Sequence, residues 1–267
     1  MMKNKKGQVT IFIIIAIVII AAIAFYFLIQ SNVIPDVPGL SDGKETNPSS
    51  FLDSCLEDKL ETTVETLMHQ GGYLGSSSEP TFNRTFMFTE EGISYDLTYL
   101  CYFELYYSPC INQKPNLMQD LEDQIKEEIG TEVQICWNDL VLSLEEEGYA
   151  IYEKYNGFEV VLSPEKLTID IDGELTLTKS GESSIKEDFS VIYPTRIYDI
   201  ANVAREIINQ EARFCNFDTL GYMIFYPQWE LNKFRPGNGD VIYKIKDTQS
   251  NKEFTFAVRS CALPPGF

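Results

Sequence analysis

Residues 7–30 read GQVTIFIIIAIVIIAAIAFYFLIQ, and this apolar run decides how the rest of the chain is interpreted. The stretch from Val9 to Ile29 carries no charged side chain. At about 1.5 Å per residue, a helix of this length covers about 31 Å, which matches the hydrocarbon core of one bilayer. The sequence therefore predicts a transmembrane helix over residues 9–30, preceded by a basic leader over residues 1–8.

The charges around the apolar run give its orientation. Lys3, Lys5 and Lys6 precede the run, and the first acidic residue is Asp36. Short basic segments stay on the cytoplasmic side of a membrane. We therefore expect a single-pass cell-membrane protein with a cytoplasmic amino terminus, an extracellular carboxy-terminal domain and the lipid bilayer as one partner.

Two processing events compete with a permanent anchor. The segment Ala22-Ile23-Ala24 matches the small-x-small cleavage site of a secretory signal, although the apolar run continues beyond it. The segment KKGQVT, residues 5–10, resembles the archaeal class III signal, a prepilin-type signal cut after its glycine. This resemblance implies processing at Lys6, Gly7 and Gln8, with Gln8 as the new amino terminus of a pilin-like subunit that assembles with identical subunits.

Length and charge limit the class of protein. The chain has 267 residues and a net charge of −19, enough length for one large or two modest domains after the anchor. With the three amino-terminal lysines set aside, 40 acidic residues face 18 basic ones, a difference of −22. Nucleic acid is excluded as a partner, because phosphate binding needs the opposite sign.

The six cysteines all follow the apolar run, and an even number in an extracellular region predicts three disulfides. Six cysteines allow about 15 pairings. Their placement favours Cys101 with Cys110, Cys55 with Cys136, and Cys215 with Cys261. The sequence has no C-x-x-C motif and one histidine, so it predicts no metal site and no cofactor.

A tether and an amphipathic helix follow the apolar run. Residues 31–50 contain three Pro and two Gly and predict an extended tether. The helix then carries an apolar stripe with Cys55 on the same face, capped by Ser49 or Ser50 and ended by Gly71-Gly72. His69 falls in its last turn, as a carboxy-terminal cation. The stripe residues are Leu52, Leu56, Leu60, Val64 and Leu67.

A second resemblance rests on three segments. The order Ser54-Cys55-Leu56, amphipathic helix and Gln70-Gly71-Gly72-Tyr73, after a KKGQVTIFI start, resembles single-span surface proteins of small-genome archaea. It implies an extracellular domain on a membrane anchor and implies no particular activity.

Residues 93–109, ISYDLTYLCYFELYYSP, are dense in aromatic side chains and predict a strand. Two interpretations stay open: buried core, or an aromatic face that binds a glycan or a protein. The candidate interaction residues are Tyr95, Tyr99, Tyr102, Tyr106 and Tyr107. Asn83 begins an N-x-T glycosylation sequon just before this segment.

A second helix is predicted from Asn116, with Gln119 completing a capping-box-like start and Gly130 breaking or bending the helix. Its stripe is Leu117, Leu121, Ile125 and Ile129. The run Glu145–Glu147 predicts a solvated face.

The second half of the chain changes to a β period, which predicts antiparallel sheet. The expected strands are 158–162, 167–171, 174–178, 189–193, 222–226, 241–245 and 254–258, with turns at Asp172-Gly173 and Asn238-Gly239. A third helix follows Pro194-Thr195, with an apolar face of Ile197, Ile200, Ala201, Ala204, Ile207 and Ile208. Asp170, Asp172 and Glu174 resemble the start of a calcium loop but lack its later ligands.

The expected fold class is α+β, with a helix-rich part over residues 51–150 and a sheet with a covering helix over residues 151–267. The sequence contains no catalytic motif. It therefore predicts an acidic, disulfide-bonded cell-surface protein with a structural or adhesion role. The alternatives are the pilin-like subunit and a surface hydrolase that uses acidic residues.

Overall fold

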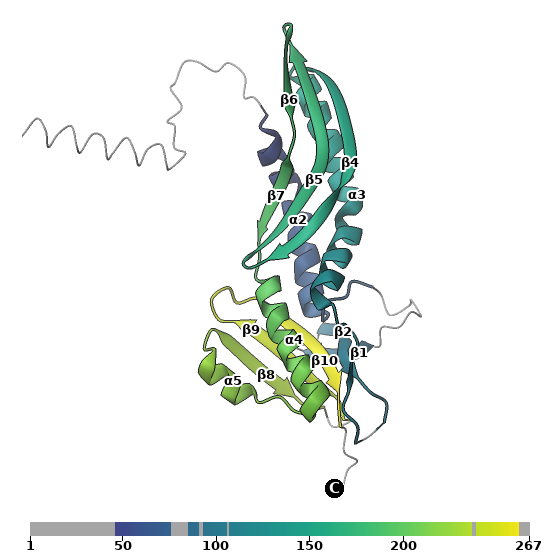
Figure 1. Ribbon diagram of the computed structural model, residues 1–267, viewed down its shortest axis with the longest axis vertical. Helices are drawn as coiled ribbons and strands as arrows, with labels where there is room; N and C mark the ends of the chain where they lie inside the picture. Colours follow the sequence, from purple (N-terminus) through teal and green to yellow (C-terminus); the bar gives the residue numbers. More distant parts are fainter. Residues whose placement is uncertain (1–45, 76–84, 91–92, 106, 237–238, 262–267) are drawn as a thin grey trace, which may run out of the picture. The chain divides into compact units, whose positions relative to one another are not determined.

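The computed structural model describes residues 46–75, 85–90, 93–105, 107–236 and 239–261 (Figure 1). These residues form the predicted α+β fold, and its strands make two sheets. The expected transmembrane helix, Val9–Ile29, lies outside the described residues. Among the helices that are described, none combines the length and the apolar character needed to cross a membrane.

Helix α2, Pro48–His69, buries the predicted stripe completely, because these residues recur on one face of the helix. Its start differs from the prediction. The Oδ1 atom of Asn47 accepts a hydrogen bond from the Ser49 amide at 3.1 Å, so Asn47 is the cap, and neither Ser49 nor Ser50 has that role. Pro48 fits the first turn, where its missing amide costs nothing. The helix thus begins inside the expected 31–50 tether.

The end of α2 is fixed by glycine, as predicted. Gly71 and Gly72 have φ values of 71° and 83°, which favour glycine, and the Gly72 amide donates to the Leu67 carbonyl at 2.7 Å. A Cβ atom on Gly71 would lie 3.1 Å from the Phe256 Cβ atom. Glycine therefore lets the end of α2 lie directly on strand β10, Glu253–Arg259.

Helix α3, Leu117–Glu146, buries its predicted stripe and runs on for 30 residues. The expected break at Gly130 is wrong: one glycine costs a helix about 1 kcal/mol, which the buried stripe on both sides of it outweighs. The expected capping box is also absent, since Asn116 makes no side-chain cap and the Gln119 amide donates to Asp123 at 3.1 Å.

The first sheet has four antiparallel strands: β4 (Ala150–Ser163), β5 (Lys166–Lys179), β6 (Glu182–Lys186) and β7 (Phe189–Pro194). Strand β5 is central, with β4 on one side and both β6 and β7 on the other. Helices α2 and α3 pack against each other and against this sheet (Figure 1).

The predicted hairpin at Asp172-Gly173 is wrong, because β5 continues through both residues. A Cβ atom on Gly173 would lie 2.4 Å from the Trp137 ring of α3, so glycine makes room for that ring. The opposite strand bulges at Asn156, between Tyr155 and Gly157. The glycine therefore serves contact between helix and sheet, and the β4–β5 turn lies near Glu165, which has a φ of 65°.

The second sheet has six strands in the order β1-β2-β10-β9-β8, with β3 paired to β2. Its other strands are β1 (Thr85–Glu90), β2 (Ile93–Tyr102), β3 (Ile111–Asn112), β8 (Trp229–Phe234) and β9 (Val241–Asp247). The β2–β10 pair is parallel, whereas only antiparallel pairing was expected. Helix α4, Ile197–Phe214, packs on β9 and β10 and buries the predicted apolar face.

One predicted strand is a helix. Residues 222–226 were expected to form a strand, but all except Tyr226 belong to α5, Thr219–Phe225. The next strand, β8, begins at Trp229. The Asp218 side chain accepts a hydrogen bond from the Gly221 amide at 3.1 Å and caps α5. A local cap thus outweighs the strand preference of the aromatic residues.

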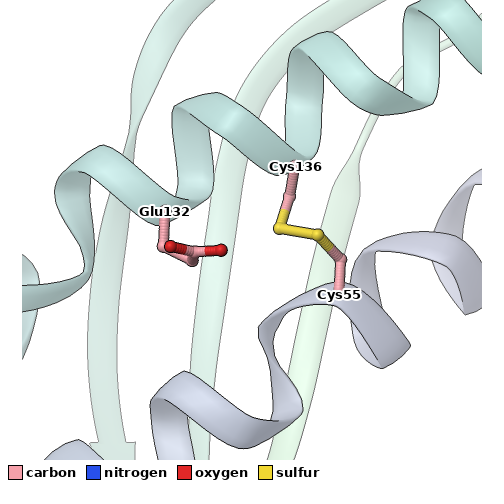
Figure 2. Close-up of side chains that lie close together, drawn as sticks. All are labelled: Cys55, Glu132 and Cys136. Carbon is pink, nitrogen blue, oxygen red and sulfur yellow. A yellow bond between two sulfur atoms is a disulfide. The ribbon is translucent and has the colours of Figure 1, made fainter.

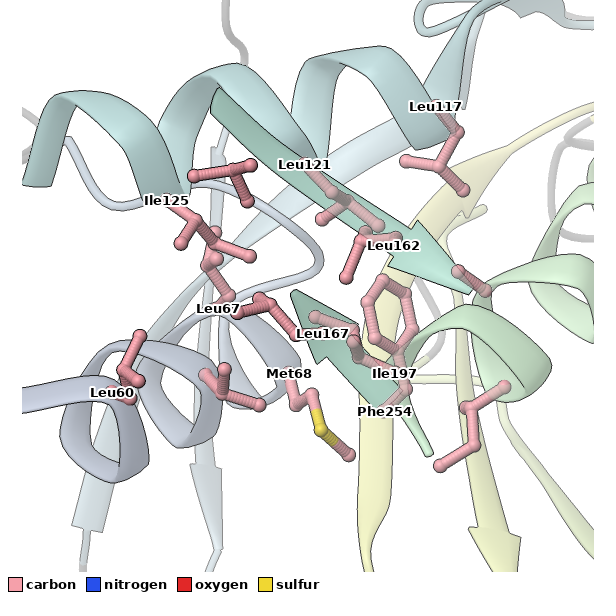
Figure 3. Packing of buried hydrophobic residues seen from close by; sticks show 14 of the residues in the cluster. Leu60, Leu67, Met68, Leu117, Leu121, Ile125, Leu162, Leu167, Ile197 and Phe254 are labelled. Atoms are coloured by element: carbon pink, nitrogen blue, oxygen red, sulfur yellow. The ribbon is translucent and has the colours of Figure 1, made fainter. Parts of the chain in front are cut away.

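A continuous core joins the two sheets. Figure 3 shows Leu67 and Met68 from the end of α2, Leu121 from α3, Leu162 and Leu167 from the β4–β5 pair, and Phe254 from β10, all in one cluster. On the other face of the six-stranded sheet, a smaller cluster holds Leu97, Tyr99, Ile242 and Ala257.

Candidate functional site

Several candidate residues lie outside the described residues: Lys6, Gly7, Gln8, Asn83 and Tyr106. The predicted processing site and the glycosylation sequon are therefore named here and not placed. Tyr95 lies within β2.

The remaining tyrosines of the aromatic segment divide between core and surface. Tyr99 is 7% exposed, and its ring meets that of Tyr102 edge to face at 5.0 Å between centroids. Burial, and then a hydrogen bond to Asp240, raise the pKa of the Tyr99 phenol well above its ordinary value. Tyr102 is half-buried and Tyr107 is 56% exposed. Tyr99 therefore belongs to the core and Tyr107 lies at the surface, while binding through this segment stays a prediction.

The disulfides are Cys55–Cys136, Cys101–Cys110 and Cys215–Cys261, the three pairs that cysteine placement favoured. The first joins α2 to α3, and the second closes the loop after β2. The third joins the end of α4 to the end of β10, where the Cys261 amide also donates to the Ser108 carbonyl at 3.0 Å. The bridges therefore fix helix ends and loops around both sheets.

The largest unexplained feature is the outer side of α5. Four large apolar side chains of α5 and of its carboxy-terminal cap, Tyr226, are exposed: Leu220 by 70%, Ile224 by 78%, Phe225 by 79% and Tyr226 by 48%, the last with its ring 4.7 Å from that of Tyr222 between centroids. We call these four residues the α5 surface. Leu220 and Ile224 stand one helical turn apart, on the same side of α5. Helix α5 thus presents to solvent the kind of side chain that α4 buries.

The size of the α5 surface sets it apart from single exposed side chains. Large apolar side chains offer about 150–250 Å² each, so these four leave roughly 500 Å² accessible. Contiguous apolar patches of about 300–600 Å² are the largest on typical monomers and are often functional. The α5 surface is therefore a candidate binding site.

The inner side of α5 explains why the helix is held in place. Tyr222 and Met223 pack against the core, and the Leu231 amide of β8 donates to the Met223 sulfur at 3.2 Å. Strand β8 is an edge of its sheet, and unpaired edges invite pairing with other chains. Helix α5 therefore protects part of this edge and exposes an apolar surface in its place.

The sequence contains a signal for the α5 surface that the predicted strand concealed. Residues 222–226 read YMIFY, five large apolar side chains in succession, with no polar residue at alternate positions. A half-buried strand or helix can bury only part of such a run. An excess of apolar side chains over one buried face makes such a segment a candidate binding surface.

The acidic candidates lie on the solvent side of β5. Asp170, Asp172 and Glu174 alternate along an extended strand, about 7 Å apart, which is not the compact loop of a calcium site. Asp172 accepts a hydrogen bond from the side-chain amide of Asn156 at 3.0 Å. It lines a hollow of about 190 Å³ with Glu174, Glu187 and Asp188 among others. Pockets for small molecules usually hold about 300–1,000 Å³, so the hollow is small for a substrate site.

His69 lines a second hollow, of about 300 Å³, with Glu65, Ser250 and Lys252 among others. The Ser250 hydroxyl donates to Asp247 at 2.8 Å, and Lys252 pairs with Glu65. A serine nucleophile needs its hydroxyl directed to a base such as histidine. The geometry therefore favours the structural role expected of His69.

One group of potential metal ligands lies within the described ranges. Figure 2 shows Glu132 one turn before Cys136 on α3, beside Cys55 of α2. The two sulfurs are bonded to each other, whereas a cysteine binds a metal ion as a free thiolate. The group therefore does not fit a metal ion while the disulfide is intact.

A buried charged cluster holds the end of α4. The Glu211 carboxylate accepts hydrogen bonds from the Tyr243 hydroxyl and, at 3.1 Å, from the Lys233 ammonium, which also donates to Asn216 at 2.9 Å. Burial lowers the pKa of Lys233, with Glu211 opposing the shift. Burial and the neighbouring Glu211 carboxylate raise the pKa of Tyr243. Because each group has a partner, the cluster is a structural attachment of α4 to β8 and β9.

Comparison of the chain with protein-family models, with curated proteins and with solved structures finds no match in any of the three.

Proposed function

We propose that the chain is a membrane-anchored cell-surface protein with an interaction role, and that it binds its partner through the α5 surface. The observation that carries the proposal is the exposure of four large apolar side chains of α5 and its carboxy-terminal cap. Exposing them to water costs free energy that a bound partner recovers.

The other features of the chain agree with this role. Three disulfides suit an oxidising, extracellular environment. The apolar run of residues 9–29 and the Pro- and Gly-rich segment after it supply the proposed anchor and tether. The strongly acidic composition suits a soluble surface domain and argues against nucleic acid as the partner.

A photo-crosslinking residue placed at Ile224 in living cells tests the proposal. We expect irradiation to give a covalent adduct of defined mass. The matched control is Ile185 on β6, which is 60% exposed and belongs to the other sheet. Absence of an adduct at Ile224, or equal adducts at both positions, would refute a binding role for the α5 surface.

A pilin-like filament subunit is the second candidate, and the observation that favours it is the Lys6-Gly7-Gln8 segment. It requires a mature chain that begins at Gln8. Mass spectrometry of the amino terminus, on protein purified from its native membrane, decides the matter. An intact Met1 or Met2 would remove this candidate and leave a permanently anchored surface domain.

A further inference from the structure

We infer that the partner of the α5 surface is a second copy of this chain, bound through the same surface by two-fold symmetry. The inference rests on the proposed interaction role and names its partner. Two observations carry it: the area of the surface and its lack of charge.

The area meets the requirement of a dimer. Two copies of the α5 surface would bury roughly 1,000 Å² in total, and specific interfaces begin at about that size. Interfaces between identical chains are also the more apolar class, which fits four apolar side chains.

Charge favours self-association at this surface over other parts of the chain. The chain has a net charge of −19, so most contacts between two copies bring like charges together. Helix α5, TLGYMIF, carries no charged side chain at neutral pH. Two copies can therefore meet there without that repulsion, and a two-fold contact is self-complementary because each residue finds the same surface opposite.

Charge also argues against a lipid surface as the occupant. Anionic headgroups would repel a chain with a net charge of −19. A second copy bound through an uncharged helix avoids that repulsion.

The test compares full-length chains purified in a mild detergent, by analytical ultracentrifugation over a range of protein concentrations. We expect the wild type to dimerise and the Ile224→Asp/Phe225→Asp double variant to dissociate, with a Kd at least ~100-fold higher. Ile185→Asp is the control, because it adds a negative charge to an exposed apolar position of the other sheet, and it should dimerise like the wild type. Circular dichroism should show the same fold for all three.

A monomeric wild type, or a double variant that dimerises as tightly as Ile185→Asp, would overturn the inference. The crosslink at Ile224 separates this failure from failure of the proposed function. An adduct of twice the chain mass supports the second copy. An adduct with a different protein rejects the second copy and keeps the interaction role, whereas absence of any adduct rejects both.

Discussion

Helices α4 and α5 are neighbours in the sequence, but α4 buries most of its apolar side chains and α5 exposes most of its own. Helix α4 places Ile200, Ala204 and Ile207 against the six-stranded sheet, where they are fully buried. Helix α5 buries Tyr222 and Met223 partly and leaves its largest aliphatic side chains in water. Apart from Phe214 at its end, the apolar residues of α4 are accounted for by folding, but those of α5 exceed what folding uses, and we propose that this excess serves binding.

The sharpest test of the comparison places the same charge in both helices. Ile207→Asp should lower the free energy of unfolding by about 5 kcal/mol or more, because it buries an unpaired carboxylate. Ile224→Asp should change it by less than about 0.5 kcal/mol, because that side chain already contacts water. Urea unfolding followed by circular dichroism measures both. Similar losses in the two variants would show that α5 is part of the core.

The disulfide at the boundary between the two helices should have the next largest effect. Cys215 ends α4 and pairs with Cys261, 46 residues later. By loop entropy, the double change of both cysteines to serine should cost about 4 kcal/mol. Cys101–Cys110 is the control, since its separation of 9 residues predicts a loss of about 2.5 kcal/mol. A larger loss at the shorter loop would contradict this account.

The charged cluster under α4 makes its attachment sensitive to alkali. The pKa of Tyr243 is raised above its ordinary value of 10.0, by burial first and then by Glu211. The stability that this tyrosine contributes is therefore complete below pH 10 and is lost as the pH rises above it. Tyr243→Phe should cost about 1–2 kcal/mol at neutral pH and should make the decline above pH 10 less steep.

The control for this change is Tyr152→Phe, because Tyr152 is exposed on β4. Unfolding free energies measured from pH 7 to pH 11 should give the same slope for that variant and for the wild type. Burial lowers the pKa of Lys233, the opposite direction to Tyr243. Both variants retain Lys233, so its contribution cancels in the comparison. If the slope of Tyr243→Phe equals that of the wild type, the cluster does not control alkaline unfolding.

The parts of the fold that the sequence predicted are those with a local cause. The stripes of α2, α3 and α4 follow a period of 3.6 residues, and each stripe is buried. The failures have causes that are distant in the sequence. Gly173 resembles a turn residue, yet it lies inside β5 because the ring of Trp137, 36 positions earlier, occupies the space beside it.

The candidate site was missed for the same physical reason. A run such as YMIFY indicates an apolar segment, but whether water or protein covers it depends on what the rest of the chain brings near. The core is already filled from α4 and the strands, and α5 is left at the edge beside β8. The parallel pairing of β2 with β10 likewise joins segments more than 150 residues apart, which no local pattern indicates.

The last prediction concerns the cap of α5 and tests whether this helix unfolds independently of α4. Helix α5 has seven residues, too few to be stable alone, and Asp218 caps it. Asp218→Ala should cost about 1 kcal/mol and should act locally, because little of α5 is buried. Hydrogen exchange should therefore accelerate at the amides of Tyr222 and Tyr226, while amides of α4 keep their protection.

The matched control is Asn47→Ala, which removes the corresponding cap from the 22-residue helix α2. Since the buried stripe of α2 holds that helix along its length, we expect faster exchange in its first turn alone. The Asp218→Ala variant should also dimerise less well, because a loosened α5 no longer presents Ile224 and Phe225 together. If α4 loses protection as well, the two helices unfold as one unit, and α5 belongs to the core after all.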